Sequence, residues 1–245
     1  VRSTPTFGIE PLFYRQSRKA KEFMNRIVQI FIGKFTWKKL FAALLGNAVL
    51  GLGEAVLRIS GMGNDPYTAM MMAISAGIPM GLGNFQLLMN LILLVLQLVI
   101  GIEYLGFGAL INLFILGYLT QAFTWLFGTA GITGAGFNLP LQLIVMVLAL
   151  AILSFGLSMY QAAGLGASPY DFLSMWMAKH FSKIPYFAGR MITDGSCVAV
   201  ILIAVFTGFI GWSGSHLGVG TVLTAFCLGP LVHFFTGINR KWINA

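Results

Sequence analysis

The stretch "GMGNDPYTAM" at residues 61–70 returns as "GLGASPYDFL" at residues 164–173. Both copies read Gly, apolar, Gly, two small or polar residues, Pro and Tyr, and each directly follows an apolar run. Glycine lets a chain leave a long helix and turn sharply, and proline suits the first turn of a new helix. The stretch therefore predicts a broken helix, and its return predicts that the chain is built from two related units.

The amino-acid composition is that of a membrane protein. Hydrophobic residues make up 58% of the 245 residues and charged residues 9%, whereas soluble domains carry roughly 25% charge. The net charge of +8 gathers near the two chain ends, which is typical of cytoplasmic ends that flank apolar spans and does not indicate nucleic-acid binding. We therefore expect an all-α polytopic membrane protein in a lipid bilayer, with its N- and C-termini in the cytoplasm.

Eight apolar runs divide the chain. They cover residues 40–57, 67–81, 85–102, 105–127, 139–163, 170–181, 191–210 and 217–235. The second and sixth runs are short, because about 15 residues of helix cover only about 22 Å of the roughly 30 Å hydrocarbon core. If both short helices cross, the chain has eight spans in two parallel units. If they are re-entrant, it has six spans in two inverted units.

Two further pairs of similar stretches support a duplication. Each homologous repeat would have three long transmembrane helices and one short broken or re-entrant helix. "IPMGLGN" at 78–84 resembles "IPYFAGR" at 184–190, and "LGFGALINLFILG" at 105–117 resembles "LGVGTVLTAFCLG" at 217–229. The predicted parts are a basic cytoplasmic tail with an amphipathic interfacial helix (1–39), a first transmembrane repeat (40–127), a linker (128–138), a second repeat (139–236) and a cytoplasmic tail (237–245).

The distribution of basic residues favours inverted units. The turn after the second short helix carries Lys179, Lys183 and Arg190, whereas its counterpart near residues 79–83 and the linker carry no Lys or Arg. Basic loops tend to stay in the cytoplasm. Inversion therefore places the basic turn inside and the two uncharged segments outside.

The repeated stretch also supplies the first candidates for a binding site. They are Asn64, Asp65 and Thr68 in the first copy and Ser168, Tyr170 and Asp171 in the second. Asp65 and Ser168 stand in the N-cap position, and Ser168 with Asp171 forms a variant of the capping box, so helix capping alone is one interpretation. A substrate site is the other, because broken helices at matching places in two repeats are typical of transporters. Asn112 and Thr224 join the candidates, since they hold the same place in the two units.

Ionisable residues inside the apolar runs give a second set of candidates. Glu54 and Arg58 lie four residues apart, as do Arg190 and Asp194, so each pair can meet on one helix face. Mutual neutralisation is one interpretation of these pairs. Coupling of transport to a proton or cation through Glu54 and Asp194 is the other, since charged residues in spans are rare and usually face a bundle interior or a water path.

The sequence holds no familiar motif of a catalytic or metal centre. There is no His-Glu-x-x-His, Gly-x-Ser-x-Gly or phosphate-loop pattern, and we expect no enzyme activity, cofactor or bound metal. We expect a small secondary transporter that binds a small molecule, anionic or strongly polar, between the two units. A non-transporting membrane scaffold for a biosynthetic or assembly partner is the alternative, and a homodimer is compatible with either.

The junction "GLGASPYD" and the Leu-Gly-x-Gly-Thr/Ala opening of the last span in each unit resemble the YczE/YitT-type bacterial membrane proteins. The resemblance covers residues 39–235. The first copy departs from the pattern because Asp65 precedes the proline and Thr68 stands where the second copy has Asp171. The resemblance implies a fold and a location in the bacterial plasma membrane, and it implies no substrate.

Overall fold

The computed structural model describes residues 18, 21, 24–25, 28–33, 35–134, 136–181, 183–211 and 217–244. Within these residues the fold is all-helical, and six helices are long and apolar enough to cross a membrane. They are α2 (Trp37–Ile59), α4 (Leu82–Ile100), α5 (Phe107–Thr129), α6 (Leu139–Ala162), α8 (Tyr186–Phe206) and α9 (Val219–Asn244). The chain is thus an all-helical multi-pass membrane protein, with six candidate spans among the described residues.

The two short helices are α3 (Pro66–Ala76) and α7 (Asp171–His180), of 11 and 10 residues. Helix α3 begins at its proline, as the repeated stretch predicts, whereas α7 begins two residues after Pro169. The glycines before them have positive φ values: 69° at Gly61, 120° at Gly63, 67° at Gly164 and 110° at Gly166. Only glycine adopts this left-handed region without strain, so the predicted break after each long helix is confirmed.

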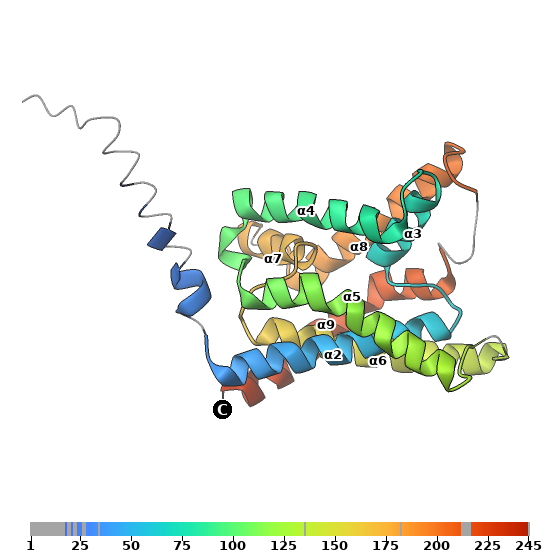
Figure 1. Cartoon of the computed structure of the whole chain (residues 1–245), viewed down its shortest axis with the longest axis horizontal. Helices are drawn as coiled ribbons and strands as arrows, with labels where there is room; N and C mark the ends of the chain where they lie inside the picture. The colour runs from blue at the N-terminus through green and yellow to red at the C-terminus, as the bar shows by residue number, and fades with distance from the viewer. Residues whose placement is uncertain are drawn as a thin grey trace, which may run out of the picture.

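The short helices meet head to head beside the middle of α8 (Figure 1). The rings of Tyr67 and Tyr170, one at the start of each short helix, stack with their centroids 4.4 Å apart. Helix α7 runs back along the first half of α8, where Ser174 contacts Thr193 at 3.1 Å. Helix α3 follows the second half of α8, where Ala73 packs in one cluster with residues of α8. Both short helices therefore start near mid-bundle and end at opposite sides of it.

Helices α2 and α6 form the tightest pair of the bundle. A Cβ atom at Gly46 would lie 2.5 Å from the backbone N of Tyr160, and one at Gly53 would lie 2.6 Å from that of Leu153. Gly46 precedes Gly53 in α2, whereas their partners Tyr160 and Leu153 follow the reverse order in α6, so the two helices run antiparallel. Glycine at these places lets two backbones approach closely, which is a common way of packing helices in a membrane.

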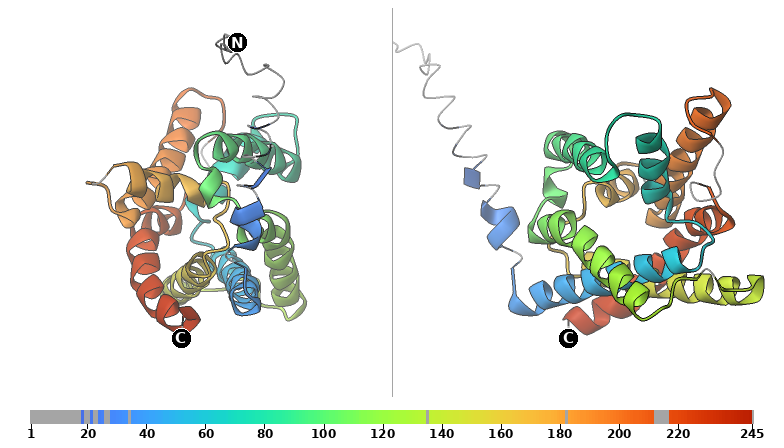
Figure 2. Two further views of the ribbon diagram at one scale, coloured as in Figure 1. Left: turned by 90° about the vertical axis from the view of Figure 1, so that its left-hand side faces the viewer. Right: turned by 45° about the vertical axis from the view of Figure 1, so that its right-hand side comes forward.

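Both ends of the described bundle lie on one side. The Lys38 ammonium lies 5.9 Å from the ring centroid of Trp242, and Figures 1 and 2 show the start of α2 beside the end of α9. We call this the terminal side, and the opposite side, where α2 ends at Ile59, the far side. An even number of spans gives this arrangement.

The two predicted tails differ in what the structure describes. Helix α9 continues to Asn244, so residues 237–244, which we expected to form a tail, are its last turns. In the predicted amphipathic helix, residues 28–32 are helical, and the Phe31 ring lies 5.1 Å from that of Phe107. Residues 1–17 of the N-terminal tail lie outside the described part of the chain.

Candidate functional site

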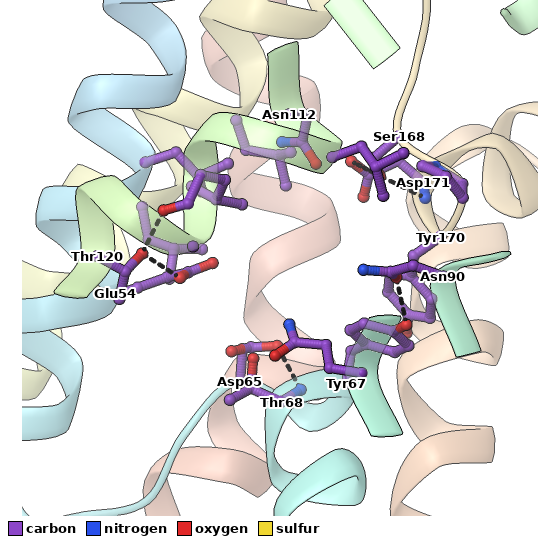
Figure 3. Close-up of a pocket in the computed structure, with 18 of the residues that line it drawn as sticks. Glu54, Asp65, Tyr67, Thr68, Asn90, Asn112, Thr120, Ser168, Tyr170 and Asp171 are labelled. Atoms are coloured by element: carbon purple, nitrogen blue, oxygen red, sulfur yellow. Dashed lines mark hydrogen bonds between the residues drawn. The ribbon is translucent and has the colours of Figure 1, made fainter. Parts of the chain in front are cut away.

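A cavity of about 540 Å³ lies between the two halves of the bundle. Its wall comes from residues 50–58 of α2, 83–90 of α4 and 112–121 of α5, together with the starts of both short helices. On α2 and α4 these stretches fall in the halves nearest the far side. The cavity therefore reaches from mid-bundle toward the far side. Figure 3 shows its polar side chains gathered around an open centre.

Most of the predicted site residues line this cavity. The nine that do are Glu54, Arg58, Asp65, Thr68, Asn112, Ser168, Tyr170, Asp171 and Arg190. Three do not. The Asn64 amide nitrogen lies 3.4 Å from the sulfur of Met72, and the Thr224 hydroxyl donates to Gly220 O on its own helix at 2.6 Å. Asp194 lies behind the wall, fully buried.

The second junction is held by a closed hydrogen-bond network. Ser168 Oγ accepts from the backbone N–H of Asp171 at 3.0 Å and donates to Asp171 Oδ2 at 2.7 Å. Tyr160 OH donates to the same carboxylate oxygen and accepts from Ser168 N–H, both at 2.7 Å. A capping box would join the acid directly to the Ser168 N–H, but here the Tyr160 hydroxyl stands between them. The N-cap of α7 is Tyr170, so the predicted N-cap position of Ser168 is wrong, and the Ser168 hydroxyl instead closes the turn before the helix.

Arg190 binds two carboxylates in the buried wall beside this network. Its Nε donates to Asp194 Oδ2 at 3.0 Å, and its guanidinium also pairs with Asp171 Oδ1. Tyr170 OH donates to Asp194 Oδ1 at 2.6 Å. The predicted Arg190–Asp194 pair is thus present, but Asp171 is a partner that four-residue spacing does not reveal.

The opposite wall carries Glu54. Thr120 of α5 donates to Glu54 Oε2 at 2.7 Å, and Glu54 Oε1 has no hydrogen-bond partner among the described residues. The predicted ion pair with Arg58 does not form, because no described carboxylate lies within 4.0 Å of that guanidinium. Figure 3 places Glu54 and Thr120 across the cavity from Tyr67 and Asn90. The free carboxylate oxygen is therefore available to a molecule in the cavity.

Several site residues were missed from the sequence. Tyr67 donates to Asn90 Oδ1 at 2.6 Å, and both line the cavity. Tyr67 holds the same place in the repeated stretch as Tyr170, so the repeat could have identified it. Nothing local marks Asn90, Thr120 or Tyr160, which join the site through helix packing.

Each junction also packs against the start of a long helix from the other half of the chain. On the terminal side, Gly108 N donates to Leu165 O at 2.7 Å, and Gln97 donates to Ala167 O at 3.0 Å. Nearby, Tyr104 donates to Met175 O at 3.2 Å. Burial raises the pKa of the Tyr104 hydroxyl above its usual value. These contacts hold the second junction and α7 against α4, α5 and the turn between them on the terminal side.

Sequence comparisons match the chain to proteins whose function is not assigned. The model of a family of unknown function, DUF6198, matches residues 37–237. A Haemophilus influenzae uncharacterized protein is 23% identical over 84% of this chain and 86% of its own length. The uncharacterized protein YyaS of Bacillus subtilis is 26% identical over 80% of this chain and 92% of its own length. The uncharacterized membrane protein YczE of the same species is 23% identical over 85% of this chain and 88% of its own length. No solved structure matches. The predicted resemblance to YczE-type membrane proteins is confirmed.

Proposed function

Because the chain belongs to the DUF6198 family, whose function is unknown, we propose a function from the cavity itself: the protein is a small secondary transporter. Its solute would bind between the two halves, beside the starts of α3 and α7. The observation that carries this proposal is a cavity of about 540 Å³, with polar side chains in its wall, where two broken helices meet near mid-bundle. Broken helices that face such a cavity are a recurrent design for binding solutes inside a membrane.

In this proposal the two halves are inverted repeats. Support comes from contacts that occur in pairs: Gly108 N donates to Leu165 O, and Gly220 N donates to Met62 O, both at 2.7 Å. Each bond joins the last long helix of one half to the junction of the other. The antiparallel packing of α2 against α6, the first long helix of each half, fits a two-fold axis in the membrane plane. An inverted pair can open to either side by exchanging the conformations of its halves.

A non-transporting scaffold is the alternative. A scaffold needs no polar cavity in its core, and the cavity weighs against this alternative because it brings Glu54 and the Asp171–Arg190 pair to one space inside the bundle. A buried charge is costly to maintain in a membrane unless it has a use or a partner. The available partners do not cover Glu54 Oε1, which favours transport.

The inverted topology predicts which positions face the outside of the cell. Single cysteines at Gly81 and Thr133, both exposed on the far side, should react with an impermeant maleimide added to intact cells. A cysteine at Lys179, on the terminal side, should react only after permeabilisation. A Cβ at Gly81 would meet nothing within 4 Å, so this substitution fits. Labelling of Lys179→Cys in intact cells would contradict the proposed orientation.

Transport predicts that the cavity opens alternately to the two sides. Gln86 lines the cavity, and Ala167 is buried on the terminal side, where its carbonyl oxygen accepts from Gln97. In a background without Cys197 and Cys227, we expect Gln86→Cys to react from outside and Ala167→Cys to react in inside-out vesicles. A disulfide or bulky label that holds the far side open should suppress the second reaction. A scaffold with one fixed conformation would leave Ala167→Cys protected from both sides.

A further inference from the structure

We propose that the cavity takes organic cations, such as solutes with a substituted ammonium group, and that Glu54 is their counter-charge. This inference rests on the proposed function, because it names the substrate class of the same cavity. It departs from the anionic or polar substrate that the sequence suggested. The reason lies in how the charges of the wall are already paired.

The charged side chains of the wall leave an excess of negative charge. Arg190 is shared between Asp171 and Asp194, so this buried group has one more carboxylate than guanidinium. Glu54 and Asp65 face the cavity with Arg58 as the remaining cation in its lining, which is again one carboxylate in excess once Glu54 is ionised. In a low-dielectric site such an excess strongly favours a cation over an anion.

The helix starts, which could have attracted an anion, are already occupied. Asp65 Oδ1 accepts from the backbone N–H of Thr68 at the start of α3 at 3.0 Å, and Ser168 Oγ accepts from that of Asp171 at 3.0 Å. An anion would have to displace these caps and lie beside the carboxylates of Asp65 and Asp171. The N-terminal ends of α3 and α7 therefore do not provide an anion site.

The carboxylate that remains open is Glu54. Thr120 engages one of its oxygens, and the other has no partner among the described residues. The facing wall offers the ring of Tyr67 and the amide of Asn90. The Tyr170 ring is already stacked on Tyr67 and lies under the Arg190 guanidinium. An anion on one side and aromatic and amide groups on the other suit an alkylammonium group, which has weak hydration and favours π-faces.

The test uses two thiol reagents of similar size and opposite charge. Trimethylammonium-ethyl methanethiosulfonate and sulfonatoethyl methanethiosulfonate are reacted with Gln86→Cys in the background without Cys197 and Cys227. Thr133→Cys, on the same side and outside the cavity, gives the baseline ratio of the two rates. We expect the cation-to-anion ratio at Gln86 to exceed that baseline by about tenfold or more, since a lined cleft concentrates ions of opposite sign.

Charge variants show which side chain causes the preference for the cationic reagent at Gln86→Cys. Glu54→Gln should return the ratio at Gln86 most of the way to the baseline, and Arg58→Gln should raise it further. The matched control is Glu103→Gln, because Glu103 lies on the terminal side, pairs with Lys179 at 2.7 Å and should leave the ratio unchanged. Gln121→Cys, also in the wall, repeats the measurement if Gln86→Cys does not fold.

The outcomes separate this inference from the function on which it rests. A ratio at Gln86 equal to or below the Thr133 baseline, or one that Glu54→Gln leaves unchanged, overturns the cationic substrate and leaves transport standing. If neither reagent modifies either cavity cysteine while Thr133→Cys reacts, the cavity is closed to solutes, and the proposed function falls together with its substrate class.

Discussion

Replacing Arg190 with leucine is expected to lower the free energy of unfolding by about 3–5 kcal/mol, the loss that follows when one member of a buried ion pair is removed. The substitution leaves the carboxylates of Asp171 and Asp194 buried without their cation, at exposed fractions of 4% and 0%. Tyr160, Ser168 and Tyr170 still donate hydrogen bonds to them, which limits the loss but supplies no charge. Thermal unfolding in detergent micelles, followed by loss of the monodisperse elution peak, measures the effect.

The companion variants show which partners matter. Asp194→Asn keeps the shape of the side chain and leaves Arg190 paired with Asp171, so it should destabilise the protein less than Arg190→Leu. From the sequence, a pair of apolar replacements at Arg190 and Asp194 should recover much of the lost stability. Because the structure adds Asp171, we now expect recovery only when all three charges are removed, with Asn at both acids. Full recovery by the double replacement would show that Asp171 does not depend on Arg190.

The sequence predicted those parts of the site that local rules control. Positive φ at Gly61 and Gly164, the cap at Asp65 and the contact of Arg190 with Asp194 each involve residues at most four positions apart, or a single glycine. Such features follow from backbone geometry and helix periodicity, which are the same wherever the segment lies in the fold.

The same rules could not supply contacts made by helix packing. Glu54 and Arg58 satisfy the four-residue rule as well as Arg190 and Asp194 do, yet Glu54 bonds to Thr120, which lies 66 residues away in the chain. Whether the Glu54 carboxylate pairs with Arg58 or accepts from Thr120 depends on how α2 and α5 cross. The sequence alone does not determine that crossing. Tyr160 enters the junction for the same reason, because α6 carries it past Ser168. The repeated stretch thus predicted several residues of the candidate site, whereas their hydrogen-bond partners depend on how the helices pack.

The contact of Gly106 with Leu165 gives the second large effect. A Cβ atom at Gly106 would collide with the carbonyl oxygen of Leu165. The φ of Gly106 is 163°, extended backbone that any residue can adopt, so lack of space is the only obstacle to a larger side chain. Gly106→Ala must therefore push the start of α5 away from the second junction, and forced overpacking of this kind typically costs about 1–3 kcal/mol.

If the protein is a transporter, the extra methyl group of Gly106→Ala should act as a wedge that also changes the resting conformation. The contact lies on the terminal side, so separating it favours the state that opens there. We expect Gly106→Ala to raise the labelling rate of Ala167→Cys in inside-out vesicles and to lower that of Gln86→Cys from outside.

Gly218→Ala, whose Cβ would collide with Met62 O on the far side, should shift the two rates in the opposite direction. Gly128→Ala lies near the end of α5, the helix that Gly106 precedes as N-cap, and its Cβ would meet nothing within 4 Å, so it should change neither rate. Equal loss of stability from both wedges, with no change in either labelling rate, would mean that the two junctions brace a single rigid conformation and that the cavity does not alternate.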